Sequence, residues 1–315
     1  MKQYLIYIFA FINIHLFSQD IIGENLFDSD LINYLQDNYK TPSVLSYNNA
    51  RDILYGEIEA PQNNNAVKGI YTNYEVTLPS GVDPSSWLYD NGIDCEHVWP
   101  QSMYEGSSPM KSDMHHLRPC KSNVNSSRGN KPYNEVNDNL TNTWFWLNYQ
   151  SSNIPGTNID EYSESGSLNF EPREDVKGDI ARSMFYFYTM YTNEANDEFF
   201  NEQKEILFQW HQEDPIENNE IIRTWAIANY QNNIPNPFIL DETLIYRAYF
   251  YEPSTEGDVN LDGNLNIVDI ILIVNYILEQ ISFSNEQIEI SDANNDNLIN
   301  VVDIILITNL ILGDI

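Results

Sequence analysis

Side chains able to do chemistry concentrate in one stretch of the chain, residues 94–130. This stretch holds three of the five histidines, both cysteines and several Arg, Lys and Asn side chains. Between residues 111 and 131 five basic residues accompany a single acid, although the whole chain carries a formal charge of −32. A local positive patch beside Glu, His and Asn is where so acidic a protein can accept a phosphate group. We therefore take this stretch as the candidate active site.

The residue types in this stretch suit hydrolysis of a phosphodiester bond. That reaction needs a base for the attacking water, a cation near the phosphate and leaving oxygen, and a positive group over the phosphate oxygens. His97 is the natural base, because an imidazole titrates near neutral pH. Glu96 and an Asn of segment 121–130 would supply oxygen ligands to Mg²⁺. Arg128 would bind the phosphate through its guanidinium.

The elements that must position these residues follow from the hydrophobic pattern. Residues 93–99 are predicted to form a strand, 115–119 a second strand, and a helix is expected to begin at Asn123. The order is therefore strand, loop, strand, helix. Because neighbours on a regular strand point to opposite faces, Glu96 and His97 converge only if the strand ends or bulges there.

The remaining chain up to about residue 250 is predicted to be a mainly helical scaffold. Aromatic residues at helical spacing near its middle are typical of a buried core rather than of a ligand site. Strands are expected within 67–78, where β-branched and aromatic residues gather. The predicted helices lie within 21–39, 46–55, 143–150, 178–192, 202–212 and 218–233.

Several motifs in a fixed order resemble the endonuclease I family of secreted nucleases. They are EHVWP at 96–100, DMHHL at 113–117 and NVNSSRGN at 123–130, followed by GDIARSMFYFY, WHQEDPIENNEIIRTWAIANYQ and NPFI. The resemblance covers most of residues 20–250. It implies an α+β fold with a ββα-metal, or His-Me finger, core in a mostly helical scaffold. It also implies a sequence-nonspecific endonuclease that cleaves DNA, with RNA as an open second substrate, and leaves 5′-phosphate ends.

Carried over position by position, the resemblance implies a role for each residue of the stretch. His97 would be the general base, Glu96 and Asn125 the ligands of one catalytic Mg²⁺, and Arg128 a phosphate-stabilising group. Asn130 is the alternative to Asn125 as ligand. Supporting positions are Asp113, His115 and His116, expected to brace the site, and Lys111, Lys121 and Lys131, expected to contact substrate phosphates unless they are ordinary solvated charges.

The N-terminus predicts export. Residues 1–18 join Lys2 to an apolar run that ends before a candidate cleavage point, which is typical of a signal peptide; a membrane anchor is the alternative. No other stretch is long and apolar enough to cross a membrane, so we expect a secreted, extracellular protein. Export permits a disulfide between Cys95 and Cys120, and two buried thiols would look the same in sequence.

An internal repeat with a spacing of 34 residues occupies the C-terminal end, where 268–278 and 302–312 agree at nine of eleven positions. Before each apolar segment, oxygen side chains stand at positions 1, 3, 5, 9 and 12 of a loop, with a main-chain carbonyl at position 7, which is typical of a calcium site. Gly263 supplies the sharp turn of the first loop, and Asn297, which tolerates a left-handed backbone, takes its place in the second. The two predicted calcium sets are Asp258, Asn260, Asp262, Asn264, Asn266 and Asp269, and Asp292, Asn294, Asp296, Leu298, Asn300 and Asp303.

These loops resemble type I dockerins, small all-α modules that dock secreted enzymes onto cohesin domains. Cellulosomal dockerins often carry a polar pair near loop positions 10 and 11, where this chain has Ile267-Val268 and Val301-Val302. A cohesin-like partner, another receptor and packing within the chain therefore stay open. The expected organisation is a signal peptide at 1–18, a nuclease domain at 19–251, a linker at 252–257 and a dockerin-like domain at 258–315.

Two other functions compete with a nuclease. A non-catalytic, calcium-dependent attachment protein needs no base beside a metal site, so Glu96 and His97 next to Asn125 argue against it. A zinc hydrolase would use His97, His115 and His116, but the chain lacks HExxH or a comparably spaced ligand set.

Overall fold

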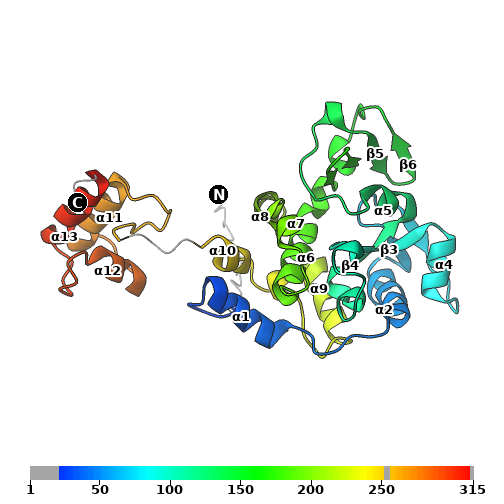
Figure 1. Cartoon of the computed structure of the whole chain (residues 1–315), viewed down its shortest axis with the longest axis horizontal. Coiled ribbons are helices and arrows are strands. Elements are labelled where there is room, and N and C mark those ends of the chain that lie inside the picture. The colour runs from blue at the N-terminus through cyan, green and yellow to red at the C-terminus, as the bar shows by residue number, and fades with distance from the viewer. Residues whose placement is uncertain (1–20, 252–255, 313–315) are drawn as a thin grey trace, which may run out of the picture. The chain divides into compact units, whose positions relative to one another are not determined.

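The chain divides into two compact units, one ending at Tyr249 and the other beginning at Phe250. The structure is a computed structural model that describes residues 21–251 and 256–312 (Figure 1). The first unit mixes helices with small sheets, as expected of an α+β fold. The predicted signal peptide and residues 252–255 of the predicted linker lie outside the described residues.

The N-terminal elements of the first unit include the predicted helices and strands, together with α3 and α4, which were not predicted. Ser46 caps α2 by accepting a hydrogen bond from the Asn49 main-chain N–H, so this helix begins where its cap lies. The helix then continues without a break through a π-helical segment. In chain order the elements are α1 (Asp28–Tyr39), α2 (Tyr47–Ile53), the π-helix (Leu54–Glu59), α3 (Ala60–Gln62), the antiparallel pair β1 (Ala66–Lys68) and β2 (Glu75–Thr77), and α4 (Pro84–Asp90).

The candidate stretch forms a strand, a loop, a strand and a helix. β3 (Ile93–His97) pairs antiparallel with β4 (Leu117–Lys121), and α5 (Ser122–Arg128) follows directly. One face of this pair packs into a hydrophobic core through Ile93 and Leu117. The second strand begins later than predicted, because residues 114–116 form a 3-10 helix capped by the Asp113 side chain.

A four-stranded antiparallel sheet occupies the region that we predicted as the helix 143–150, so that prediction is wrong. Leu147 adopts a φ of +49°, which turns the chain between two strands. Thr, Trp and Phe are common in β-strands. The run is so short that the spacing of its aromatic residues fits a helix as well as a strand. The strands, in the order β6-β5-β7-β8, are β5 (Thr143–Trp146), β6 (Tyr149–Ser151), β7 (Ser163–Ser165) and β8 (Phe170–Glu171).

The predicted aromatic helix is the centre of the first unit. α6 (Lys177–Met190) is buried along nearly its whole length. Its Gly178 lies so close to the Asp214 carbonyl that a Cβ would come within 2.1 Å of it, so a side chain would force α6 away. The aromatic stripe is thus core, as predicted. The helices that follow are α7 (Asp197–Asn201), α8 (Lys204–Glu213), α9 (Asn218–Ala228) and α10 (Leu244–Tyr249).

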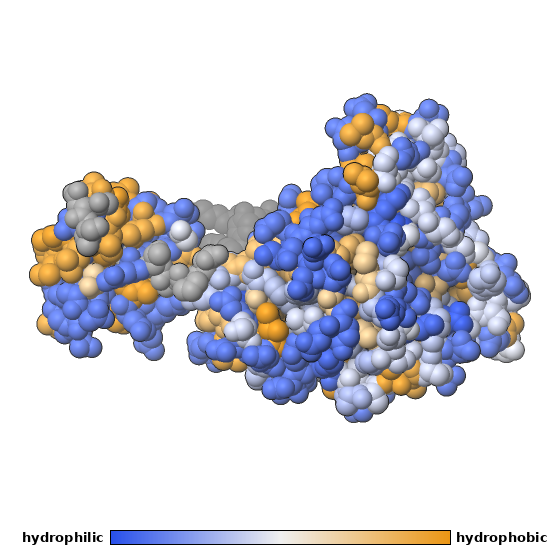
Figure 2. Space-filling view, in the orientation of Figure 1, coloured by the Kyte–Doolittle hydropathy of each residue, from blue (hydrophilic) through white to orange (hydrophobic). Residues whose placement is uncertain are grey.

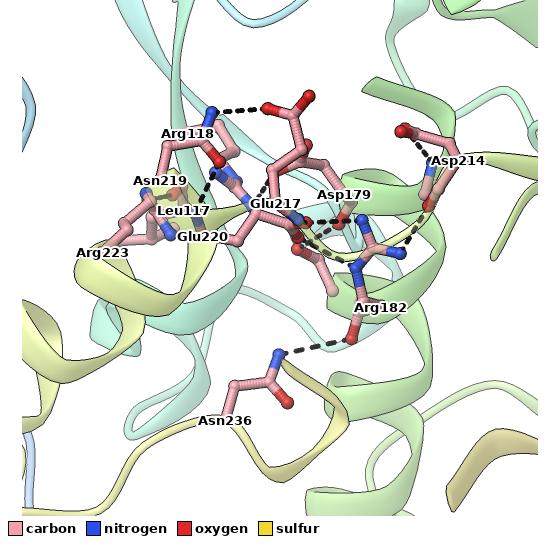
Figure 3. Close-up of polar contacts among 12 residues, drawn as sticks. Leu117, Arg118, Asp179, Arg182, Asp214, Glu217, Asn219, Glu220, Arg223 and Asn236 are labelled. Carbon is pink, nitrogen blue, oxygen red and sulfur yellow. Dashed lines mark hydrogen bonds and ion pairs between the residues drawn. The ribbon is translucent and has the colours of Figure 1, made fainter. Parts of the chain in front are cut away.

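A buried ion pair connects β4 to α6, and a buried hydrogen bond connects β4 to α9 (Figure 3). Arg118 on β4 pairs with Asp179 on α6 at 2.9 Å, and Arg223 on α9 donates to the Leu117 carbonyl at 2.7 Å. Arg182 and Glu220 join the two helices at 2.6 Å. Because removing one partner of such a pair leaves a buried charge, these contacts fix β4 against the helical scaffold.

The second unit is helical in its described part, with α11 (Ile267–Ile277), α12 (Asn285–Ser291) and α13 (Val301–Leu312). Its fully buried hydrophobic core is small and consists of Val259, Ile273 and Ile307, with half-buried neighbours around them. Figure 2 shows hydrophobic residues gathered on the surface of this unit. Among the helices of the described residues, none is both long and apolar enough to span a membrane.

Candidate active site and calcium loops

Glu96 is buried at the end of β3, with 2% of its surface exposed. Its Oε1 accepts a 2.6 Å hydrogen bond from the Tyr71 hydroxyl and lies 3.2 Å from Arg128 Nη1. Burial raises the pKa of Glu96, while the Arg128 charge and the Tyr71 hydrogen bond act in the opposite direction. Within the described part of the chain no hydrogen bond reaches Oε2. One carboxylate oxygen is therefore fixed by two partners, and the other is left without one among the described residues.

His97 is held at both ring nitrogens. Its Nε2 lies 3.1 Å from the Lys111 carbonyl, and its Nδ1 lies 3.0 Å from Gln101 Nε2. Because a carbonyl only accepts, Nε2 carries the proton and Nδ1 is left with a lone pair that accepts from the Gln101 amide. Burial, followed by the charge of His116, lowers the pKa of His97 to about 3. The ring is therefore neutral at ordinary pH, with its basic nitrogen defined.

β3 ends at His97. The side chains of Glu96 and His97 can serve one site only if the strand ends or bulges there, so this condition is met. Their contacts nevertheless differ, because Glu96 binds Tyr71 whereas the His97 ring lies 5.5 Å from the Tyr47 ring. Among the described residues no hydrogen bond joins the two side chains. A substrate serving both would have to lie across the end of the strand.

Asn125 lies on α5 beside the same strand. Its Nδ2 donates to the Cys95 carbonyl at 3.4 Å, so the amide side chain faces the residue next to Glu96. In the described residues no hydrogen bond reaches its Oδ1. Open oxygens of an amide and a carboxylate are suitable ligands for Mg²⁺.

Arg128 is fully buried. The sequence prediction was different, because it expected the guanidinium to contact a substrate phosphate directly. Its Nη1 donates to the His97 carbonyl at 3.2 Å and its Nη2 to the Val98 carbonyl at 2.7 Å. The guanidinium also lies 4.4 Å from the centre of the Tyr133 ring. In this geometry Arg128 holds the end of β3 and the Glu96 carboxylate in place.

The two calcium loops have the same internal hydrogen bonds, displaced by one repeat. Asp258 Oδ2 accepts from the Gly263 main-chain N–H at 2.9 Å, and Asp292 Oδ2 accepts from that of Asn297 at 2.7 Å. Gly263 and Asn297 have φ values of +77° and +65°, which confirms the prediction that Asn replaces Gly in a left-handed turn.

A second hydrogen bond is repeated in the two loops. Asn266 Nδ2 donates to the Asn264 carbonyl at 2.7 Å, and Asn300 Nδ2 donates to the Leu298 carbonyl at 3.0 Å. Among the described residues no group of three or more His, Cys, Asp and Glu side chains is arranged to hold a metal ion. Both kinds of predicted metal site therefore depend on asparagine or main-chain oxygens as well as on carboxylates.

Comparison with known families separates the chain at the same place as the fold. The family model described as Endonuclease I matches residues 25–242. The chain belongs to the Endonuclease I family. The Dockerin type I domain model matches residues 256–312 of this endonuclease I chain, which contain both calcium loops.

Two relatives of the endonuclease I unit are named extracellular ribonuclease. The protein from Bacillus subtilis (strain 168) is 31% identical over 214 residues, which are 62% of this chain and 66% of the relative. The protein from Bacillus amyloliquefaciens is 30% identical over 212 residues, which are 62% of this chain and 65% of the relative. The chain thus spans slightly less than two thirds of the length of these curated relatives.

Three supporting residues of the endonuclease I site have different partners. Asp113 Oδ2 accepts from the Tyr186 hydroxyl at 2.8 Å and anchors the loop before β4 to α6. Burial lowers the pKa of His115 to about 4, and its Nε2 donates to the Ile234 carbonyl. Only His116 contacts the predicted base, with its ring 5.6 Å from that of His97. The structure thus gives His116 the closest supporting position.

The three lysines expected to contact phosphates have different partners, and only Lys111 contacts a residue of the candidate site. The Lys111 main chain holds His97, while its Nζ lies 5.0 Å from the Tyr47 ring centre. Lys121 Nζ lies 5.2 Å from the Tyr74 ring centre. Lys131 Nζ donates to Ser165 Oγ at 2.7 Å and to the Gly166 carbonyl at 2.8 Å. Their contact with substrate stays a prediction.

Cys95 and Cys120 are free thiols, so the structure favours the second of the two sequence alternatives. Cys95 pairs across the strands with Pro119, and Cys120 pairs with Asp94. The two cysteines therefore occupy adjacent rungs of the ladder, and side chains on adjacent rungs point to opposite faces. A disulfide cannot form across this pair without a change of register.

Three site residues were absent from the sequence prediction, namely Tyr71, Gln101 and Tyr133. Tyr71 and Tyr133 share a 2.6 Å hydroxyl contact beneath Glu96. Gln101 follows His97 by four residues, which alone could have suggested a local contact. The two tyrosines carry no comparable signal, because they lie far from Glu96 in the chain and resemble ordinary core residues.

Proposed function

We propose that the chain is a secreted, metal-dependent, sequence-nonspecific endonuclease. It hydrolyses phosphodiester bonds of DNA, and of RNA as a second substrate, to products with 5′-phosphate ends. The carrying observation is the His97 ring at the end of β3, which is held at Nε2 by the Lys111 carbonyl and keeps a lone pair on Nδ1, one residue after Glu96. Membership of the Endonuclease I family and two relatives named extracellular ribonuclease support the class of reaction and the secretion.

In this proposal His97 Nδ1 takes a proton from the attacking water. The water oxygen bonds to phosphorus as the bond to the 3′ oxygen breaks, and that oxygen leaves as a hydroxyl with a proton from solvent water. The Lys111 carbonyl keeps the Nε2 proton in place, so only Nδ1 can act as base. The water takes the position of the Gln101 amide, which already approaches Nδ1 as a hydrogen-bond donor. A negatively charged phosphate nearby raises the pKa of His97 from about 3 toward the range in which a base is effective.

Glu96 Oε2 and Asn125 Oδ1 would hold one Mg²⁺, since both are open oxygens next to β3. When bound, the ion supplies positive charge to the phosphate and the leaving oxygen. Glu96 is kept in position by Tyr71 and Arg128, so the carboxylate does not have to be ordered when the ion binds.

Arg128 contributes charge from behind the strand. Its guanidinium is occupied by the His97 and Val98 carbonyls, so it acts on the phosphate through electrostatics and through the geometry of β3. Lys111, Lys121 and Lys131 would contact flanking phosphates and would concentrate the substrate at an otherwise acidic protein.

The second unit would bind two calcium ions and attach the enzyme to a cohesin-like partner. The Dockerin type I match and the repeated hydrogen bonds of the two loops support this role. Corresponding apolar residues follow the two loops and are largely exposed, which suits contact with another protein. They are Ile267, Val268 and Ile271 on α11, and Val301, Val302 and Ile305 on α13.

The test of the proposal is hydrolysis of labelled DNA and RNA by the purified chain with Mg²⁺, followed by analysis of the product ends. We expect cleavage of DNA with 5′-phosphate ends, and loss of cleavage in Glu96→Gln and Asn125→Ala that excess Mg²⁺ partly restores. Tyr89→Ala, which removes an exposed ring from α4, is the control. Binding of nucleic acid without any cleavage would instead favour an attachment protein.

A further inference from the structure

A hollow on the β5–β6 hairpin has no role in the site described above. Its volume is about 630 Å³, within the roughly 300–1,000 Å³ typical of small-molecule sites. Aromatic and apolar side chains line it together with two asparagines. The residues that matter here are Trp146, Asn148, Tyr149, Asn153 and Tyr162, which we call the aromatic pocket.

The rings of the aromatic pocket offer faces rather than hydrogen-bond donors. The Trp146 and Tyr162 ring centres are 5.4 Å apart and their planes meet at 44°, so the two rings do not cover each other by stacking. Trp146 Nε1 is buried and has no hydrogen-bond partner in the described part of the chain. Trp146 would therefore contact a ligand through the face of its ring. Tyr149 is 56% exposed. Open aromatic faces of this kind bind flat rings by stacking.

The hairpin that carries the pocket is attached to the candidate active site at two points. Asn123 on α5 donates to Gln150 Oε1 on β6 at 2.8 Å, and Figure 1 shows the hairpin next to α5. The Leu147 main-chain N–H donates to the Thr72 carbonyl at 2.7 Å. Thr72 follows Tyr71, whose hydroxyl binds Glu96. A substrate bound at the active site is therefore within reach of the hairpin.

The surface next to the pocket carries both basic and acidic side chains. A second hollow of about 490 Å³ shares Leu147 and Asn148 with the aromatic pocket and is lined by Lys68. Lys68 also lines a third cavity of about 310 Å³, into which three arginines project. These are Arg118, Arg173 and Arg223, the first and last of which are drawn in Figure 3. Five acidic residues line the same cavity against four basic ones, and three of the acids pair with these arginines, so the cavity has no net positive charge.

We propose that the aromatic pocket binds an unpaired nucleobase of the substrate, so that the enzyme prefers single-stranded or locally unpaired nucleic acid. Trp146 and Tyr162 stack on the base, and the Asn148 and Asn153 amides meet its polar edge. A duplex keeps its bases stacked and cannot fill the pocket without opening. The inference rests on the proposed nuclease function and names the form of substrate that this function uses.

The test measures binding of two short, labelled single strands of equal length and charge, one with thymine bases and one abasic. Fluorescence anisotropy is recorded in buffer with calcium and without magnesium. We expect Trp146→Ala and Tyr162→Ala to weaken binding of the thymine strand about tenfold, while binding of the abasic strand is unchanged. Trp146→Phe, which keeps an aromatic face, restores most of the affinity, and Tyr89→Ala is the control.

Two results would overturn the inference. One is an equal effect of Trp146→Ala on both strands, which would show a general change of fold or charge. The other is binding of a soluble oligosaccharide that depends on Trp146 while binding of the thymine strand does not. Failure of the nuclease function is separate, because it appears as absence of cleavage by the unaltered chain with Mg²⁺, whatever the binding of the two strands.

Discussion

The candidate active site and the predicted calcium loops would both depend on a few oxygen ligands, but the fold holds these ligands in different ways. Glu96 is fixed by distant parts of the chain, Tyr71 and Arg128, in a buried network. In the first loop, Asp258 is fixed by main-chain groups only a few residues away. The first site is therefore organised by the surrounding fold, and the second by the loop and the ion that it would bind.

The hydrophobic cores of the two units differ in size. α6 is buried along most of its length, whereas the second unit has only Val259, Ile273 and Ile307 fully buried. A small core supplies little stability by itself, and small domains commonly depend on bound metal. The comparison predicts that metal removal disturbs the second unit much more than the first.

Calcium removal should have the largest effect on stability. In calorimetry of the full chain, we expect EGTA to lower the transition of the second unit and leave that of the first unchanged. Each calcium site contributes about 2.7 kcal/mol when the free ion is at a hundredfold excess over Kd. Equal shifts of both transitions would contradict the contrast between the two units.

Arg128→Met tests whether the first site is organised by its buried charges. The substitution leaves the Glu96 carboxylate buried without its partner, so we expect a loss of roughly 3–5 kcal/mol in the free energy of unfolding of the first unit. Urea denaturation measures this value. Lys204→Met removes a partly exposed positive charge and should cost less than about 0.5 kcal/mol. Similar losses in both variants would show that Arg128 has no special structural role.

The pH dependence of stability should contain a contribution from His115. Burial lowers its pKa to about 4 from 6.5, so between these values the unfolded chain binds a proton that the folded chain does not. His115 therefore decreases the free energy of unfolding as the pH falls. His115→Gln keeps a donor for the Ile234 carbonyl and removes the titration.

Relative to the unaltered chain, His115→Gln should gain on the order of 2 kcal/mol as the pH falls from 6.5 to about 4. Denaturation of both proteins at several pH values measures the difference. A stability difference that does not change with pH would contradict the burial of a neutral His115.

The smallest expected effect compares the two calcium loops at one position. Gly263 has a φ of +77° and open space where a Cβ would lie, so Gly263→Ala should cost roughly 1 kcal/mol through backbone strain alone. Asn297→Gly should leave stability nearly unchanged, because Asn already tolerates the left-handed turn. Thermal denaturation with calcium present compares them, and a greater loss in Asn297→Gly would contradict the equivalence of the loops.

Local patterns predicted the parts of the molecule that local chemistry determines. The repeat spacing predicted two equivalent loops, and the left-handed turn expected at Asn297 is confirmed. The motif order identified β3, β4 and α5, with the boundary of β4 shifted by the Asp113 cap. Long-range contacts were beyond this kind of prediction, because the hydroxyl of Tyr71 and the guanidinium of Arg128 meet Glu96 only in the folded chain.

The error at residues 143–150 has a similar cause. The run TWFWLNYQ is too short for hydrophobic periodicity to separate a strand from a helix, and the pairing of β5 with β7 decides it. The burial of Arg128 could not be predicted from the sequence either. An arginine can bind a phosphate at the surface or hold main-chain carbonyls in the interior, and the residue type is the same in both cases. What sequence reasoning predicted was the chemistry of the stretch, which stays a prediction, and what it missed was the direction in which each side chain points.

The most direct test of the account is the rate of phosphodiester hydrolysis by His97→Ala under single-turnover conditions with saturating Mg²⁺. Loss of a general base should lower the rate by about 10²–10⁴-fold, with Mg²⁺ affinity unchanged because Glu96 and Asn125 remain. Circular dichroism confirms that the variant is folded. A rate within about threefold of the unaltered chain would contradict the assignment of His97 as the base.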